Sequence, residues 1–187
     1  MPLILASGSP RRREILSMIT EKFTVIKPQK DEITDPSLSP AMQVQELSRQ
    51  KAREVFASEP KAVVIGSDTV VEQDGNILGK PKDQADAAAQ LRLLSGRWHN
   101  VHTGVTILGA GQEHCFTTTS RVKFAPMTEE EIAAYIATGE PMDKAGSYGI
   151  QGFGGKFVES IEGDFYSIMG LPLCRVYQIL SEISLLD

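Results

Sequence analysis

The sequence predicts an α/β fold, in which a mixed, twisted sheet carries helices on its faces. Apolar runs of strand length alternate with segments of helical periodicity along the 187 residues. Two turn signals, Asp74-Gly75 and Gly109-Ala110-Gly111, mark β-hairpins. Because hairpins pair strands antiparallel and helix crossovers pair them parallel, we expect both kinds of pairing in one sheet.

The N-terminal half is expected to alternate strands and helices. In order, we expect a strand over 2–6, a helix from 10, a strand over 23–26, a loop over 27–40, a helix over 40–58 and a strand over 62–71 that is interrupted at 66–69. Ser9-Pro10 and Ser39-Pro40 mark the two helix starts, since serine caps a helix and proline suits its first position.

The C-terminal half is expected to add hairpins and further helices. In order, we expect a helix from Asp83 to about Gly96, strands over 101–108 and 116–124, a helix over 128–138, a glycine-rich stretch over 143–155, paired strands over 156–161 and 165–169, and a closing helix over 172–186. Thr128 and Glu131 have the spacing of a capping box. No linker separates domains, so one domain over 1–187 is predicted.

Composition excludes several classes of protein. The net charge of −5 speaks against a general nucleic-acid binder. No stretch approaches the roughly 20 apolar residues that cross a bilayer, and the N-terminal apolar run is too short for a signal peptide, so a cytoplasmic location is expected. Cys115 and Cys174 form no CxxC pair and suggest no disulfide framework.

The segment from Ser7 to Arg13 predicts an anion site. Residues 1–30 hold six basic and two acidic residues, although the whole chain is acidic. Arg11, Arg12 and Arg13 stand in the first turn of a helix, where the helix dipole disfavours positive charge unless an anion binds. The alternative is a solvated basic helix start. No Walker A motif occurs in the sequence.

Lys51 stands on an apolar stripe with Val44, Leu47 and Val55. An ammonium there is costly unless it has a partner or extends to solvent, and the spacing leaves both outcomes open.

Asp68 follows the apolar run from Val63 and is expected at or near a strand end, where α/β folds bind ligands. Its carboxylate suits a divalent cation or a proton-accepting role, with a turn residue as the alternative. Glu32 could supply a second carboxylate or be a solvated loop acid.

Two loops could contact a nucleotide. Gly79-Lys80-Pro81 restricts Lys80, which could face a phosphate or lie in a surface turn. In the stretch from Asp143 to Gly152, glycines allow close approach to a ligand, and the amide of Gln151 suits a base edge. A glycine-rich surface loop is the alternative.

The histidines do not suggest a zinc site or a catalytic triad. His99 and His102 would lie on opposite faces if their segment were a strand, and neither an HExxH nor a GxSxG motif occurs.

Taken together, these motifs resemble the Maf family of nucleotide pyrophosphatases. The matching segments are Leu5 to Arg12, Lys51-Ala52, Gly66 to Val71, Leu78 to Pro81, Leu94 to Gly104, Asp143 to Gly152 and Gly170 to Leu173. They follow the family order across nearly the whole chain. Ser67 departs from the pattern, since alanine is common there in the family.

The resemblance implies a cytoplasmic enzyme that hydrolyses a nucleoside triphosphate to the monophosphate and pyrophosphate. It also implies an elongated two-lobed α/β fold, similar to that of ITPases, with a central cleft, a divalent cation such as Mg²⁺ or Mn²⁺, and a homodimer. Asp68 matches the catalytic aspartate of the family and, with Glu32, the metal site. The expected phosphate-binding residues are Ser7, Arg11, Arg12, Lys51 and Lys80.

Three positions resemble the branch of the family that prefers dTTP and UTP. These specificity residues are Arg11, Thr69 and Gln151. The alternatives are the same reaction on 7-methyl-GTP or a non-standard purine nucleotide, and a nucleotide-binding regulator of cell division without catalysis.

Overall fold

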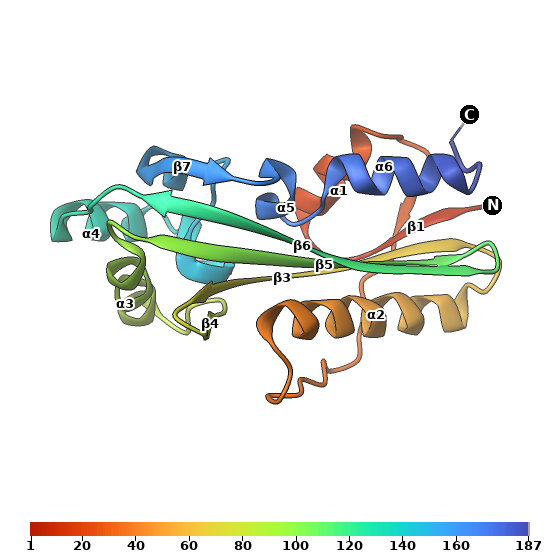
Figure 1. Ribbon diagram of the computed structural model, residues 1–187, viewed down its shortest axis with the longest axis horizontal. Helices are drawn as coiled ribbons and strands as arrows, with labels where there is room; N and C mark the ends of the chain where they lie inside the picture. The colour runs from red at the N-terminus through yellow and green to blue at the C-terminus, as the bar shows by residue number, and fades with distance from the viewer. Residues whose placement is uncertain (187) are drawn as a thin grey trace. The chain divides into compact units, whose positions relative to one another are not determined.

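Seven strands form one sheet in the computed structural model, which describes residues 1–186 (Figure 1). The strands are β1 (Leu3–Ala6), β2 (Thr24–Val25), β3 (Val63–Gln73), β4 (Asn76–Leu78), β5 (Trp98–Gly109), β6 (Gln112–Phe124) and β7 (Val158–Glu162). The α-helices are α1 (Pro10–Ser17), α2 (Pro40–Ser58), α3 (Gln84–Leu94), α4 (Glu129–Ala137), α5 (Phe165–Met169) and α6 (Leu173–Glu182). Three 3-10 turns are η1 (Glu140–Asp143), η2 (Ala145–Ser147) and η3 (Phe153–Phe157).

The sheet contains both parallel and antiparallel pairs. Its order is β2-β1-β3-β5-β6-β7, with β4 paired to β3. In β1, Leu5 lies opposite Val25 on one side and Ile65 on the other, and both pairings are parallel. The hairpin of β3 and β4 pairs Val71 with Leu78 antiparallel. The predicted mixed α/β class is therefore confirmed.

Contacts divide the chain into two compact units. Unit 1 comprises residues 1–68, 103–118 and the C-terminal segment from 170, and unit 2 comprises residues 69–102 and 119–169. The strands β3, β5 and β6 contribute residues to both units. A single domain over the whole chain stays a prediction.

In unit 1, α2 covers one face of the sheet while α1 and α6 cover the other (Figure 1). Ile4, Ala52, Val55 and Val64 pack together between α2 and the strands. Gly66 makes this approach possible, because a Cβ there would lie 2.3 Å from the carbonyl oxygen of Ser48.

In unit 2, the helix starts follow the predicted local signals. The Asp83 carboxylate accepts a hydrogen bond from the Asp86 amide at 2.8 Å and caps α3. The Thr128 hydroxyl accepts from the Glu131 amide, and the Glu131 carboxylate accepts from the Thr128 amide, so the predicted capping box is confirmed.

The prediction of a strand over 165–169 is wrong, because these residues form helix α5. The Asp164 carboxylate accepts hydrogen bonds from the amides of Tyr166 at 2.8 Å and Ser167 at 3.3 Å, which favours a helical turn. Strand β7 pairs antiparallel with β6 instead. The closing helix is also shorter than predicted, since α6 ends at Glu182.

Strands β5 and β6 begin three to four residues earlier than the apolar pattern indicates, at Trp98 and Gln112. The first polar residues of β5 find partners across the unit: His99 contacts the Tyr148 hydroxyl, and Asn100 donates to Glu72. Tertiary contacts thus extend a strand beyond its apolar run. No helix within residues 1–186 has both the length and the apolar character needed to cross a membrane.

Candidate active site

The turn that precedes α1 is held by the Ser7 side chain, which also contacts the first turn of the helix. Ser7 at the end of β1 is buried, and its hydroxyl accepts hydrogen bonds from the Ser9 amide at 3.1 Å and from Arg12 Nη1 at 3.3 Å. Ser9 occupies the N-cap position, but its side chain makes no cap hydrogen bond, contrary to the prediction. The reason is that Ser7 orders this turn from the preceding strand. The first turn of α1 contains no acidic residue, so its dipole favours an anion.

Arg12 is held in place by two groups of unit 1. Besides its contact with Ser7, its Nε donates to the carbonyl oxygen of Gly170 at 2.9 Å. Burial lowers the pKa of the Arg12 guanidinium and Arg11 acts in the same direction, while Asp68 and Glu32 oppose them. Arginine stays charged, so unit 1 presents a partly dehydrated cation next to two carboxylates.

Lys51 joins the two carboxylates. Its ammonium contacts Asp68 Oδ1 directly and lies 2.9 Å from Glu32 Oε1. The Lys51 and Asp68 side chains are each 13% exposed, whereas Glu32 is 46% exposed. The sequence predicts for Lys51 either a charged partner or an extension to solvent, and the structure shows the charged partner. Glu32 takes part in the same set of ion pairs and is not simply a solvated loop acid.

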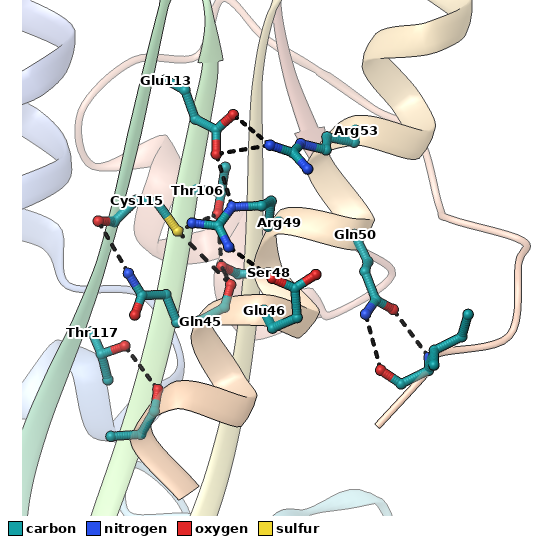
Figure 2. A network of polar contacts seen from close by, with 12 residues as sticks. Gln45, Glu46, Ser48, Arg49, Gln50, Arg53, Thr106, Glu113, Cys115 and Thr117 are labelled. Atoms are coloured by element: carbon teal, nitrogen blue, oxygen red, sulfur yellow. Dashed lines mark hydrogen bonds and ion pairs between the residues drawn. The ribbon is translucent and has the colours of Figure 1, made fainter. Parts of the chain in front are cut away.

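Polar contacts attach helix α2, which carries Lys51, to the hairpin of β5 and β6; Figure 2 shows these contacts. The Glu113 carboxylate accepts from Arg49 Nε at 2.8 Å and from Arg53 Nη2 at 3.0 Å. Deeper in the same interface, the hydroxyls of Ser48 and Thr106 lie 2.8 Å apart.

The loop that carries Glu32 is tied to the same helix. Gln50 forms two hydrogen bonds with the backbone of Ile33, one to its amide at 3.0 Å and one to its carbonyl oxygen at 2.9 Å (Figure 2). One turn further, Glu54 accepts from the Gln29 amide at 2.6 Å. Sequence reasoning missed both residues, although their i, i+4 spacing places them on one helix face.

Asp68 lies within a strand, not at its end. Strand β3 continues to Gln73, and Asp68 stands two residues beyond Gly66, where the parallel pairing with β1 stops. The polar interruption over 66–69 therefore does not end the strand. Ser67 explains this, because its buried hydroxyl lies 3.0 Å from the carbonyl oxygen of Gly104 and 2.9 Å from that of Gly170.

Ser67 and Arg12 thus meet at one carbonyl oxygen, that of Gly170. This shared acceptor links strand β3, the start of α1 and the turn before α6. The segment from Gly170 to Leu173 resembles a Maf motif in sequence, and its structural role here is to supply this shared acceptor.

Three predicted residues belong to unit 2. Thr69 is half-buried on β3, Lys80 is exposed in the turn after β4, and Gln151 is exposed in the glycine-rich segment. The Gly146 amide donates to the carbonyl oxygen of Gly79 at 3.3 Å, so the Lys80 turn lies against that segment. Unit 1 holds the other predicted residues: Ser7, Arg11, Arg12, Glu32, Lys51 and Asp68.

The histidines of β5 have partners inside unit 2. His102 Nδ1 lies 2.8 Å from the Thr119 hydroxyl, and its Nε2 lies 3.4 Å from Glu72 Oε2. Burial raises the pKa of Glu72, but hydrogen bonds from Asn100, Gly75 and His102 outweigh it and leave the pKa below its ordinary value.

The donor set of unit 1 fits a divalent cation bound together with a phosphate. Asp68 and Glu32 converge on one positive charge, the Lys51 ammonium. Mg²⁺ is typically held by one or two carboxylates, with phosphate oxygens and water completing its shell. Within residues 1–186, no group of three or more His, Cys, Asp or Glu side chains is arranged to hold a metal by itself.

Comparison with known proteins decides the family. The family described as "Maf-like protein" matches residues 2–183. The chain belongs to the Maf family. The residues described above in unit 1 all fall inside the matched range.

Several bacterial relatives are named dTTP/UTP pyrophosphatase. The chain is 48% identical over 178 residues to the dTTP/UTP pyrophosphatase of Bacillus pumilus, covering 95% of this chain and 94% of that protein. It is 45% identical over 186 residues to the dTTP/UTP pyrophosphatase of Aquifex aeolicus, with 100% and 97% covered. A Geobacillus protein of the same name is 50% identical over 173 residues, with 92% and 93% covered.

One solved structure has a similar fold. The Ham1 protein of Staphylococcus aureus aligns with a TM-score of 0.51 over 84% of this chain and 80% of that chain. Its sequence identity is 17%, so the likeness concerns the fold alone.

Proposed function

We propose that this Maf protein hydrolyses dTTP and UTP to the nucleoside monophosphate and pyrophosphate. The relatives that match nearly its full length carry that activity in their names. The observation that carries the proposal is the cluster of unit 1, in which Arg12, next to Arg11 at the start of α1, interacts with two carboxylates that also pair with Lys51. Such a set can bind an anion and a cation together.

Phosphate binding falls to the cations. Arg12 and Arg11, at the start of α1, bind phosphate oxygens through the guanidinium fork. Lys51 adds a point charge beside the carboxylates. From unit 2, we assign Lys80 to the triphosphate by the family resemblance.

The carboxylates hold the cation and the nucleophile. Asp68 and Glu32 would bind Mg²⁺ or Mn²⁺, which when present neutralises phosphate charge and lowers the pKa of bound water. In the same proposal, Asp68 would accept a proton from the attacking water. The water oxygen bonds to the α-phosphorus, the bond to the bridging oxygen breaks, and pyrophosphate leaves.

Base selection is assigned to Arg11, Thr69 and Gln151. The Gln151 amide offers both a donor and an acceptor, which matches the edge of thymine or uracil. A homodimer and a cytoplasmic location, which the family resemblance implies, stay predictions.

The test is pyrophosphate release from a panel of nucleotides with Mg²⁺ or Mn²⁺. The panel contains dTTP, UTP, CTP, GTP, ITP and 7-methyl-GTP. We expect dTTP and UTP to be the preferred substrates. Because Asp68 is proposed both to accept a proton from the attacking water and to bind the cation, Asp68→Asn should reduce turnover by about 10³-fold.

Asp31→Asn is the matched control, because Asp31 is an exposed acid in the loop next to Glu32. It should leave turnover unchanged. Turnover of 7-methyl-GTP or ITP alone would reject the base assignment. Full activity of Asp68→Asn would reject the role of Asp68, and nucleotide binding without any turnover would favour the regulator.

A further inference from the structure

The segment that carries Gln151 has buried flanks. Tyr148, Gly149 and Ile150 before it are buried, and so is Gly154 after it, whereas Gln151 is exposed. A loop that presents one polar side chain from a buried frame needs its backbone held on both sides. Two side chains of unit 2, Tyr135 and Glu140, form hydrogen bonds to the backbone on the two sides of Gln151.

Glu140 holds the downstream side. Its Oε1 accepts a hydrogen bond from the Phe153 amide at 2.9 Å, and its Oε2 accepts from the Gly154 amide at 2.9 Å. A carboxylate that accepts two backbone N–H groups fixes the chain more strongly than neutral acceptors do.

Tyr135 holds the upstream side. Its hydroxyl accepts from the Gly149 amide at 3.1 Å and donates to Glu140 Oε2 at 2.6 Å. One donor and one acceptor satisfy this hydroxyl. Tyr135 and Glu140 therefore connect the two flanks of Gln151 through three atoms.

The loop backbone is shaped around this pair. A Cβ at Gly152 would lie 1.8 Å from Glu140 Oε1, and a Cβ at Gly154 would lie 2.5 Å from the Tyr135 hydroxyl. Both distances are far below van der Waals contact, so a larger residue at either position would displace Glu140 or Tyr135 from these hydrogen bonds. The glycines give room for the pair rather than flexibility.

The surroundings keep Glu140 ionised and Tyr135 protonated, which are the states that these hydrogen bonds require. Burial would raise the pKa of Glu140, but hydrogen bonds from Tyr135, Gly154 and Phe153 and the charge of Lys144 outweigh it and leave the pKa below its ordinary value. Burial and the hydrogen bond to Glu140 raise the pKa of Tyr135, so its hydroxyl keeps its proton.

We infer that Tyr135 and Glu140 act as a clamp that holds the Gln151 loop and thereby sets the preference for the base. Both are positioning residues, since they act through the loop backbone. The inference rests on the proposed function, in which the Gln151 amide reads the base edge. An amide can serve cytosine in a flipped orientation, so a loosened loop discriminates less.

The experiment compares Glu140→Gln, Tyr135→Phe and a control, Glu130→Gln. Glutamine keeps the size of Glu140, but its NH₂ group cannot accept, so at least one of the three hydrogen bonds is lost. Phenylalanine removes only the hydroxyl of Tyr135. Glu130 is an exposed carboxylate of α4 that, among the described residues, makes no hydrogen bond to the loop.

Two quantities are measured for each protein: hydrogen exchange of the amides over 149–154, and the ratio of kcat/KM for dTTP to that for CTP. We expect about tenfold faster exchange confined to this loop and a dTTP/CTP ratio lowered by about tenfold. The control should match the wild type in both. A merely structural role would lower activity on both nucleotides equally.

Two outcomes would overturn the inference. Unchanged exchange in Glu140→Gln would show that the carboxylate does not hold the loop. Faster exchange with an unchanged dTTP/CTP ratio would show that the held loop does not set the preference. If the wild type hydrolysed neither dTTP nor UTP, the proposed function would fall, and the exchange rates would still decide whether the clamp exists.

Discussion

Lys51 is a charged residue on an apolar helix face, and its burial is compensated by ion pairs. On spacing alone, its ammonium interrupts an apolar stripe of α2. The ion pairs with Asp68 and Glu32 compensate its lost hydration, and they also hold two like charges close together. In the proposed function, the same three side chains would exchange partners when a triphosphate and a cation bind.

Glu32 is expected to set the metal requirement. Replacing it by glutamine removes one negative oxygen ligand while keeping the size, so the Mg²⁺ concentration for half-maximal activity should rise about tenfold. A Mg²⁺ titration of chelator-treated enzyme measures this. Asp31→Asn serves as control, and an unchanged requirement in Glu32→Gln would remove Glu32 from the metal site.

His99 is expected to make stability depend on pH. Its ring is buried against Phe124 and Tyr148, and burial lowers its pKa from 6.5 to about 4. Between these values the unfolded chain binds a proton that the folded chain does not. The free energy of unfolding should therefore fall by about 3 kcal/mol as the pH falls from 6.5 to 4. Above pH 6.5 the histidine is neutral in both states, so it causes no further change in stability with pH.

Urea denaturation of the wild type and of His99→Gln between pH 7.5 and 4.5 isolates this effect, since the carboxylates titrate in both proteins. The variant should be less stable at pH 7.5, and the difference should shrink by about 2 kcal/mol toward pH 4.5. A constant difference would mean that the histidine is not held neutral.

At the scale of elements, α2 positions two of the six predicted residues of unit 1, Lys51 and Glu32. It carries Lys51, and through Gln50 and Glu54 it holds the loop with Glu32. Its close approach to the sheet depends on glycines. At Gly104 a Cβ would lie 2.2 Å from the carbonyl oxygen of Val44, so the helix backbone rests directly on β5.

Gly104→Ala should therefore destabilise the protein by about 3 kcal/mol, because the added methyl pushes α2 away from the strand. Gly79→Ala is the matched control, since no atom lies within 4 Å of its Cβ position. The control should be unchanged or slightly stabilised. Thermal denaturation compares the two, and equal melting temperatures would contradict the close packing.

At the scale of the whole molecule, β3, β5 and β6 pass through both compact units. If one unit unfolds, the parts of these three strands that belong to it unfold as well, and the other unit loses the continuation of its own strands. We therefore expect cooperative unfolding, although the contacts cluster in two units.

Trp98, the one tryptophan of the chain, reports on unit 2, where the Arg121 guanidinium lies 4.6 Å from its ring centre. Unfolding by urea should give the same midpoint by Trp98 fluorescence and by far-ultraviolet circular dichroism, which sees both units. Two separate transitions would show that the units are independent domains.

The sequence by itself determined the features that depend on near neighbours. The caps at Asp83 and Thr128 are interactions over three residues, and the fold class follows from the alternation of periods. The sequence also singles out Arg11, Arg12 and Lys51 as candidate site residues, because a charge at a helix start or on an apolar stripe conflicts with its local surroundings.

Only the tertiary structure decided the outcomes that depend on distant partners. Lys51 pairs with Asp68, 17 residues away, and Ser67 bonds to Gly170, 103 residues away. Strand β3 continues through its polar residues because these partners satisfy them, and Glu140 meets Gly154 because a glycine loop leaves it room. Local propensity contains no information on which distant groups will bury one another, so packing alone selects them.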